Sequence, residues 1–464
     1  MFRDFSKATE PAPSNVIELP GGPMAPAEAI DNDAADKAVD QAMRDRFDLK
    51  HRLHEMLLER LNLAILDRVQ KEELRREVAS LVTDVLRAEG QNLPTSEFRQ
   101  LIEELLYEVL GLGPLEPLLA DPSINDILVN AHDSVYVERQ GVLEKSSVRF
   151  RDEKHLLRII DKIVSRVGRR IDESVPWVDA RLEDGSRVNA IIRPCAIDGP
   201  SVSIRKFSRV PLTMRRMLEI DTLNEDAAML LKGLVEARLN ILISGGTGSG
   251  KTTMLNAMSS YISNRERIVT IEDAAELQLQ QDHVVRLETR PANTEGVGAI
   301  MQRDLVRNAL RMRPDRIIVG EVRGAEAFDM LQAMNTGHDG SMTTIHANTA
   351  RDALSRVEQM VLMGGYELPH SAIRAQIAAA VHFVVQLNRL SDGRRRVLSI
   401  SEITGMEGDV ITMQDIFVFR RTGKDAQGRV LGHFTPTGIR PKSAELLAAA
   451  GVDISKISFR RTDA

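Results

Sequence analysis

The stretch Gly245-Gly-Thr-Gly-Ser-Gly-Lys-Thr-Thr253 constrains the fold of this chain more than any other feature. It comes directly after the mostly apolar run 239–242 and overlaps the start of a segment with helical spacing, 252–263. Glycines lack a Cβ atom, so backbone amides can curl around phosphate oxygens, and the start of a helix adds partial positive charge. The spacing therefore predicts a phosphate-binding loop between a strand and a helix.

Two side chains of this stretch have separate expected roles. Lys251 is expected to reach the β- and γ-phosphates of a nucleoside triphosphate, and the Thr252 hydroxyl to ligate Mg²⁺. The predicted nucleotide-binding residues of the loop are Gly245, Gly246, Thr247, Gly248, Ser249, Gly250, Lys251, Thr252 and Thr253.

Acidic residues follow two later strand-like runs. Glu272 and Asp273 end the β-rich run 268–271, and Glu321 follows the buried-strand pattern 316–320. The carboxyl ends of strands in an α/β sheet border the crevice where ligands bind. Carboxylates placed there can order an attacking water and hold the water ligands of a metal ion, so Glu272 and Glu321 are predicted catalytic residues.

Two histidines lie in the polar, glycine-bearing stretch 335–349 rather than on an apolar face. A histidine at this position can sense the γ-phosphate or transmit its loss to a moving element. We predict this role for His346; an ordinary hydrogen-bonded histidine is the alternative for it and for His338.

The regions before the loop differ in composition and in the spacing of their apolar residues. The first 45 residues are rich in Pro, Ala and acids, which predicts a disordered tail, either merely solvated or docking a partner. Apolar residues at helical spacing then predict three packed helices, the third with Thr95 or Ser96 as N-cap and Gly111 as its end. Their charged faces are either solvated or dock a partner. The following strands and turns predict a mixed α+β domain ending near Phe207.

Arginines recur along this α+β region. Arg181, Arg187, Arg193 and Arg205 are spaced so that several can share one face, although surface strands also carry arginines for solubility alone.

The C-terminal part predicts two hairpins and a short last helix. Asp392-Gly393 marks the turn of the first hairpin, and the second covers 411–434. We interpret the cluster Arg394-Arg395-Arg396 as solvated hairpin charge, with contact to an acidic loop of a membrane protein as the alternative.

Composition excludes several classes of protein. With 464 residues, 43% of them hydrophobic, the chain is long enough for two or three domains. Its single cysteine, Cys195, can form neither an internal disulfide nor a multi-thiolate metal site, which fits a reducing compartment. We find no apolar run of about 18 residues and no N-terminal leader pattern, and the net charge of −6 argues against broad attraction to nucleic acid.

Four motifs in order resemble one known family. "GGTGSGKTT", "TIEDAAELQL", "RPDRIIVGEVR" and "GHDGSMTTIHANT" are similar to the motifs of the ATPases that drive type II and type IV secretion and type IV pili. The resemblance extends from Leu105 to Ser401 and is strongest to the CpaF branch, which powers tight-adherence (Tad, type IVc) pili. One cysteine cannot build the four-cysteine zinc module common in the type II and pilus-assembly branches, which favours the CpaF branch further.

The resemblance implies an α/β fold, with a RecA-like P-loop NTPase C-terminal domain, a smaller α+β N-terminal domain and a preceding helical bundle. ATP with Mg²⁺ would bind between the two lobes of each subunit in a hexameric ring. The expected division is a tail at 1–45, a bundle at 46–112, an N-terminal nucleotide-clamping domain at 113–207, a hinge at 208–212 and the ATPase domain at 213–464.

The resemblance also implies residue roles. Lys251 and Thr252 match the Walker A residues, and Glu272 matches the catalytic acidic box. Glu321 matches the Walker B glutamate, and His346 the histidine that contacts the phosphate region. Arg193 and Arg205 resemble the arginines with which the N-terminal lobe reaches the nucleotide.

The implied function is a hexameric motor that uses ATP hydrolysis to rotate lobes and drive assembly, with or without retraction, of a Tad/type IV-like pilus. Its partners would be inner-membrane platform proteins and, indirectly, pilin, with no direct contact to nucleic acid. Its expected location is the cytoplasm, at the inner face of the membrane. The alternatives are a type IV secretion ATPase for protein or DNA export, a RecA-like DNA motor and a non-catalytic nucleotide-dependent scaffold.

Overall fold

The strands of the chain pair into two sheets in this computed structural model, which describes residues 46, 48–57, 71–90, 92–139, 141–207, 212–292 and 296–460. The predicted tail and most of the predicted hinge lie outside these residues. Residues up to Gly113 and residues from Pro114 onward form two compact units. The finer division proposed from the sequence stays a prediction.

The first unit is helical. Its described helices are residues 48–57, α2 (Lys71–Ala88) and α3 (Thr95–Leu110). Their apolar faces form one cluster in which Leu53, Val78 and Leu105 are fully buried, as the helical spacing predicts. The predicted extension of the first helix through 61–65 lies outside the described residues.

The ends of α3 differ from the prediction on one side. The N-cap is Pro94, without a side-chain cap, so the prediction of Thr95 or Ser96 is wrong: both already lie inside the helix. The predicted end at Gly111 is confirmed, because its N–H donates to the Tyr107 carbonyl.

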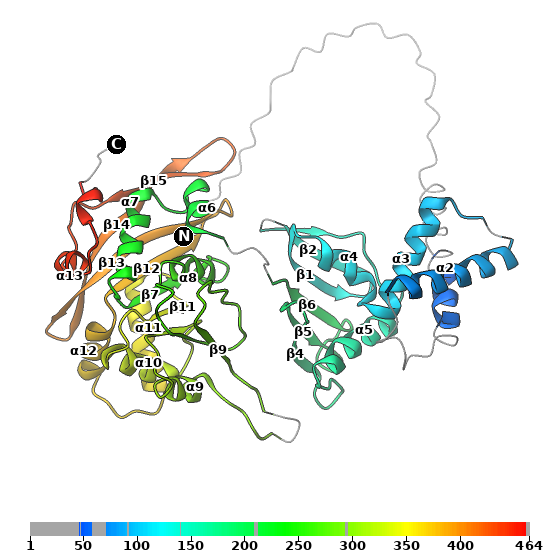
Figure 1. Ribbon diagram of the computed structural model, residues 1–464, viewed down its shortest axis with the longest axis horizontal. Helices are drawn as coiled ribbons and strands as arrows, with labels where there is room; N and C mark the ends of the chain where they lie inside the picture. The colour runs from blue at the N-terminus through cyan, green and yellow to red at the C-terminus, as the bar shows by residue number, and fades with distance from the viewer. Residues whose placement is uncertain are drawn as a thin grey trace, which may run out of the picture. The chain divides into compact units, whose positions relative to one another are not determined.

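The first sheet of the second unit is antiparallel, with strand order β3-β2-β1-β6-β5-β4. The strands β2 and β3 pair around Gly141, and β4 and β5 pair around Asp184-Gly185. The strand β4 begins at Trp177, the only tryptophan of the chain, whose side chain is exposed. Helix α5 packs beside β4 through its apolar face (Figure 1). The elements are α4 (Glu116–Ala120), β1 (Ile124–Ala131), β2 (Ser134–Arg139), β3 (Val142–Lys145), α5 (Glu153–Arg166), β4 (Trp177–Arg181), β5 (Arg187–Ile191) and β6 (Ser201–Arg205).

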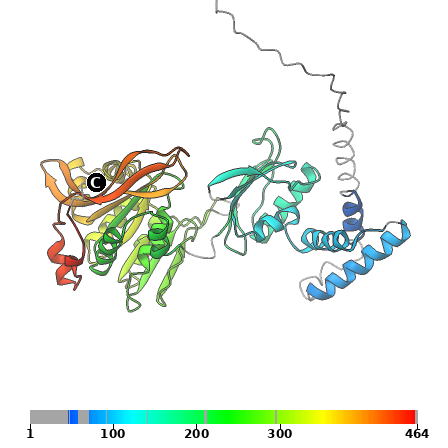
Figure 2. The same ribbon diagram turned by 90° about the horizontal axis from the view of Figure 1, so that it is seen from above.

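The second sheet has nine strands in the order β15-β14-β13-β12-β7-β11-β10-β8-β9. The strands from β12 to β9 in this order are parallel, and β13, β14 and β15 extend the sheet antiparallel, as the orange to red strands in Figures 1 and 2. Both predicted C-terminal hairpins are thereby confirmed, as is the short last helix, α13. The strands are β7 (Ile241–Gly245), β8 (Ile268–Glu272), β9 (Val284–Glu288), β10 (Arg316–Val319), β11 (Met342–Ile345), β12 (Phe383–Arg389), β13 (Arg395–Glu407), β14 (Val410–Lys424) and β15 (Val430–Pro436).

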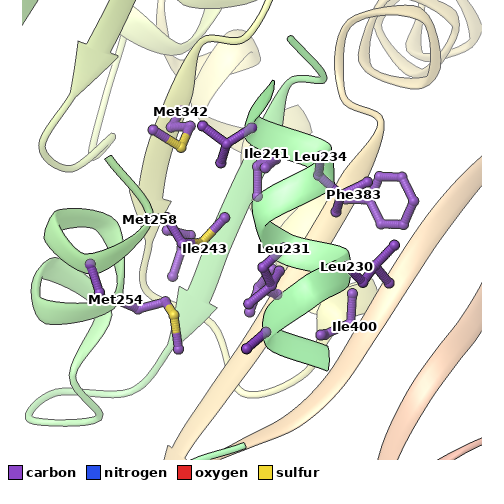
Figure 3. Close-up of a cluster of buried hydrophobic side chains, with 14 of the residues drawn as sticks. Leu230, Leu231, Leu234, Ile241, Ile243, Met254, Met258, Met342, Phe383 and Ile400 are labelled. Carbon is purple, nitrogen blue, oxygen red and sulfur yellow. The ribbon is translucent and has the colours of Figure 1, made fainter. Parts of the chain in front are cut away.

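Helices cover both faces of this sheet. Ile241 and Ile243 of β7 lie in the core with α6, α7, α8 and α13, whereas Leu242 between them lies in the core with α9, α10, α11 and α12. Figure 3 shows Leu230 and Leu234 of α7 against the first of these cores. The helices are α6 (Met214–Glu219), α7 (Glu225–Glu236), α8 (Lys251–Ser259), α9 (Gln302–Ala309), α10 (Glu326–Asn335), α11 (Ala350–Met363), α12 (His370–Ala380) and α13 (Ala444–Ala449). The predicted α/β, RecA-like fold class is therefore confirmed.

A buried charge begins β10. The Arg316 side chain is fully buried and donates to both carboxylate oxygens of Glu266, at 2.7 and 3.1 Å, and to the carbonyls of Val235 and Gly340. A Cβ at Gly340 would stand 2.5 Å from Nη1 of Arg316, so only glycine leaves room for the guanidinium. This pair anchors one end of the central strands.

Candidate active site

The predicted phosphate-binding loop connects β7 to α8. Gly248 and Gly250 have φ angles of 69° and 93°, a region that side chains with a Cβ rarely adopt. A Cβ at Gly245 would stand 2.4 Å from Oγ of Ser249 and 2.7 Å from the Leu387 carbonyl. Helix α8 has Gly250 as its N-cap and no side-chain cap, so its first amides are available to an anion. The loop therefore fits a phosphate group.

Lys251 is the first residue of α8 and its side chain is largely buried. Its Nζ donates to the Gly246 carbonyl at 3.1 Å and lies 3.2 Å from Nε2 of His346. Burial lowers the pKa of Lys251, while the nearby Glu321 carboxylate acts in the opposite direction. A bound triphosphate would place a negative counter-charge beside the Lys251 ammonium.

His346 and Glu321 come from neighbouring strands. His346 follows β11, and Glu321 lies two residues after β10, its Oε1 2.8 Å from Nε2 of His346. Burial lowers the pKa of His346, against the attraction of Glu321. The same Nε2 faces Lys251, and one ring nitrogen either accepts from Lys251 or donates to Glu321. The histidine is thus placed between the phosphate-binding lysine and the acid.

Glu272 is the last residue of β8 and is buried. Burial raises its pKa to about 7, although the N–H groups of Glu276 and Leu277 donate to its Oε2 and act in the opposite direction. Gly320 makes room for it, because a Cβ there would stand 2.8 Å from Cγ of Glu272. Its Oε1 is buried and has no hydrogen-bond partner among the described residues. This carboxyl is poised to exchange a proton near neutral pH.

Residues beyond the predicted set complete this region. Nη2 of Arg323 donates to Glu321 at 2.6 Å, and its Nη1 lies 3.6 Å from Asp273. The hydrogen bond that Arg323 donates to Glu321 raises the pKa of Arg323, and burial raises that of Asp273. Arg323 stands two residues after Glu321 inside the quoted "GEVR" motif, so its alternation with the acid along an extended segment could have identified it. A cleft is lined by Arg187, Thr252, Glu272, Asp273, Ala274, Glu276, Gln302, Gly320, Glu321 and Arg323.

Three arginines of the first sheet lie side by side on neighbouring strands. Cross-strand pairing places Arg181, Arg187 and Arg205 in one row across β4, β5 and β6. Arg187 donates to the Ala274 carbonyl and lies 3.0 Å from Glu276, so it reaches the cleft.

The two arginines predicted to clamp the nucleotide pair within their own region instead. Arg193 lies 3.3 Å from Glu153, and Arg205 lies 3.3 Å from Asp126. No described contact joins either of them to the phosphate-binding loop, and their clamping role stays a prediction. His338 precedes β11, whereas His346 follows it, so His338 lies at the opposite end of that strand.

Thr252 and the neighbouring carboxylates form the oxygen-rich part of the cleft. Hydroxyl and carboxylate oxygens are the ligands that Mg²⁺ prefers, so the residues present fit this ion.

Across the described part of the chain, no helix is both long enough and apolar enough to span a bilayer.

Comparison with known proteins gives consistent matches. A Mycobacterium tuberculosis protein that carries a provisional name as a conjugal transfer protein is 42% identical over 312 residues, covering 66% of this chain and 88% of that protein. The type IV secretion system protein PtlH of Bordetella pertussis is 35% identical over 318 residues, covering 62% and 93%. The crystal structure of the VirB11 ATPase from the Brucella suis type IV secretion system, in complex with sulphate, is 30% identical, covers 62% of this chain and 95% of that chain, and has a TM-score of 0.34.

The model of one protein family matches two thirds of the sequence. The match runs from residue 108 to residue 429 and so includes the phosphate-binding loop, both strand-end acids and His346. The chain belongs to the family described as Type II/IV secretion system protein.

Proposed function

We propose that this chain is a Mg²⁺-dependent ATPase that works as a homohexameric motor for a Tad/type IV-like pilus. One observation carries the catalytic part: Glu321 and His346, which follow the parallel strands β10 and β11, converge on Lys251 at the start of α8. The relatives named above support a place in a secretion or conjugal transfer machine, and the resemblance of the four motifs supports the pilus. The location at the inner face of the cytoplasmic membrane and the platform proteins as partners belong to the same proposal.

The first step of the proposed reaction is an exchange of partners by Lys251. In the described state Lys251 satisfies its charge with the Gly246 carbonyl and His346. The β- and γ-phosphates of ATP are stronger acceptors for an ammonium group than a neutral imidazole is. Lys251 would therefore turn to the phosphates, and Nε2 of His346 would be free to donate to Glu321. The histidine would report an occupied site to the Walker B acid.

Glu321 is the proposed residue that orients the attacking water. Arg323 holds one of its carboxylate oxygens, and the other faces His346, so its orientation is fixed from two sides. Thr252 and waters held by the strand-end carboxylates would bind Mg²⁺, which neutralises charge on the β- and γ-phosphate oxygens when bound. Glu272, with its raised pKa, is the group available to take or return a proton.

Coupling to movement would use the arginine row. Arg187 and Arg181 already donate to the backbone carbonyls of Ala274 and Ala275, next to Glu272. Contacts between this row and the acidic strand end would link the first sheet to the state of the site. Loss of the γ-phosphate would then release lobe movement, which a ring passes to its membrane partners.

The replacement Glu321→Gln tests the catalytic part. We expect phosphate release to fall at least about 100-fold because the amide cannot act as a base, while nucleotide binding and the assembled mass, measured by light scattering, stay unchanged. The matched control is Glu219→Gln, which changes an exposed glutamate on α6 and should leave phosphate release as in the wild type. Equal release by the wild type and Glu321→Gln, or turnover by a monomer, would contradict the proposal.

Export through a type IV secretion system is the second candidate, favoured by relatives named for conjugal transfer and type IV secretion. Placing Glu321→Gln on the chromosome of the source organism separates the two. Loss of surface pili with unchanged DNA or protein export supports the pilus motor, and the reverse result supports the export ATPase.

A further inference from the structure

The turn between β12 and β13 brings arginines against the outer side of the phosphate-binding loop. Nε of Arg395 donates to the Gly248 carbonyl at 2.9 Å. A Cβ at Gly250 would stand 3.5 Å from Cδ of Arg395, and one at Gly248 would stand 3.8 Å from Nη1 of Arg389. The Arg395 side chain therefore lies beside both left-handed glycines, and the Arg389 guanidinium lies beside Gly248.

We propose that Arg395 is a positioning residue for nucleotide binding, which holds the Gly248–Ser249 peptide so that its N–H faces the phosphates. This inference rests on the proposed ATPase function and adds a residue that the motifs of the chain do not include. Arg395 acts on the nucleotide through the loop backbone.

The planar trans peptide explains how a contact on the outside acts on the inside. The Gly248 carbonyl and the Ser249 N–H belong to one peptide unit and point in opposite directions. With the oxygen held by Arg395, the N–H points into the loop, where it makes a long bond of 3.4 Å to the Gly246 carbonyl. A guanidinium on the oxygen also polarises the peptide and strengthens its N–H as a donor to an anion.

The pairing of the two strands supports a role beyond packing. Arg389 and Arg395 are direct cross-strand partners, so their side chains leave the same face of the hairpin. Like charges placed directly opposite each other destabilise a strand pair. The carbonyls of Gly248 and Gly141, which accept from Arg395 and Arg389 respectively, offset this repulsion on the outer side of the loop. A polyphosphate in the loop would offset it further.

The position follows from the sheet order. Leu387 of β12 pairs with Gly245 at the end of β7, so the chain leaving β12 passes the start of the phosphate-binding loop. The turn at Asp392-Gly393 returns it at Arg395. Any arginine on the inward face of this hairpin must therefore meet the loop.

The three consecutive arginines have different environments: the interpretation as solvated charge fits the exposed Arg394 and Arg395 and is wrong for Arg396. Arg394 is exposed and lies 3.9 Å from Asp392. Arg396 is buried, donates to the Asp221 carbonyl and stacks over Phe419, 5.1 Å from its ring centroid. Arg395 is the member of the cluster that contacts the loop. Alternation along a strand, which sends neighbours to opposite faces, is the physical reason.

The test compares Arg395→Ala with Arg394→Ala, which removes the same charge one residue away. Titration with a fluorescent ATP analogue should give about three- to tenfold weaker binding for Arg395→Ala, since one charge-assisted hydrogen bond to the loop is lost. The KM for ATP should rise by the same factor while kcat changes less than twofold. Arg394→Ala should match the wild type, and Arg395→Lys should recover part of the affinity.

The outcomes separate this inference from the proposed function. Lys251→Ala serves as the reference for a lost phosphate site. If the wild type binds no better than Lys251→Ala, the proposed ATPase function fails. If Lys251→Ala loses binding but Arg395→Ala and Arg394→Ala both bind like the wild type, the function stands and the positioning role is overturned. A fall in kcat at unchanged KM for Arg395→Ala also overturns it. Thermal unfolding of Arg395→Ala should match the wild type, because the side chain is exposed.

Discussion

Carboxylates in the two sheets experience opposite environments. Glu272, in the nine-stranded sheet, is buried with one oxygen unsatisfied among the described residues, and its pKa rises to about 7. Asp121, beside the six-stranded sheet, is half-buried, and hydrogen bonds from Ser123, helped by Arg139, lower its pKa to about 2. The charged form of Glu272 is thus destabilised by its surroundings, whereas that of Asp121 is stabilised. Uncompensated buried groups are typical of sites that perform chemistry.

The largest expected effect concerns Glu266, a buried carboxyl beside the nine-stranded sheet whose charge is compensated. Burial raises the pKa of Glu266, but hydrogen bonds and charge from Arg316 and Arg238 outweigh it and lower the pKa overall. Glu266→Gln would leave the Arg316 guanidinium buried without a counter-charge. We expect a loss of about 3–5 kcal/mol in the free energy of unfolding, measured by urea denaturation. A loss below about 1 kcal/mol would mean that the backbone carbonyls alone stabilise Arg316.

A second prediction concerns the sign of a pH dependence. The pKa of Glu272 is raised from 4.5 to about 7, so the folded state binds a proton that the unfolded state releases. Stability from this group is fully present below about pH 4.5 and is lost as pH rises through about 7. Glu272→Gln keeps the acceptor for the Glu276 and Leu277 amides but cannot ionise.

The measurement is the difference in unfolding free energy between Glu272→Gln and the wild type across pH. It should shift in favour of the variant by up to about 3 kcal/mol between pH 4.5 and 8. Asp121→Asn is the matched control with the opposite sign: stability from Asp121 is present above about pH 4 and lost as pH falls towards 2. If the difference in unfolding free energy for Glu272→Gln did not change with pH, the pKa of Glu272 would not be raised, and its contrast with Asp121 would disappear.

The smallest expected effect concerns an ion pair of the six-stranded sheet. Asp126 lies 3.3 Å from Arg205, whose side chain is mostly exposed. Asp126→Asn should change the free energy of unfolding by less than about 1 kcal/mol, and the change should vanish at high salt. A salt-independent loss of more than about 2 kcal/mol would show that the arginine row depends on this pair.

Local patterns predicted the elements that hold the site. The glycine spacing predicted the loop at 245–250, and acids after apolar runs placed Glu272 and Glu321 at strand ends, because runs of buried residues and left-handed glycines leave direct traces in a sequence. The two C-terminal hairpins followed from alternation and from Asp392-Gly393.

Non-local contacts escaped prediction. Arg395 looked solvated because nothing near it in the sequence shows that β12 pairs beside β7. Arg187 was not assigned to the site for the same reason: strand order decides which side chains meet there, and local periodicity does not contain it. Arg323 was missed for a different reason, because its contact with Glu321, two residues away, is local and its spacing was overlooked. The N-cap of α3 was missed because Pro94, a residue without a capping side chain, precedes the helix.

The placement of the single tryptophan gives this protein a built-in optical probe. Trp177 begins β4 at the edge of the six-stranded sheet, and 56% of its side chain is exposed. Indole emission shifts to shorter wavelengths when water leaves the ring, so the tryptophan emission of the chain reports on the surroundings of Trp177. Nucleotide titrations followed by tryptophan emission would detect any binding or movement that covers the β4 edge. They would need no label and no substitution in the site.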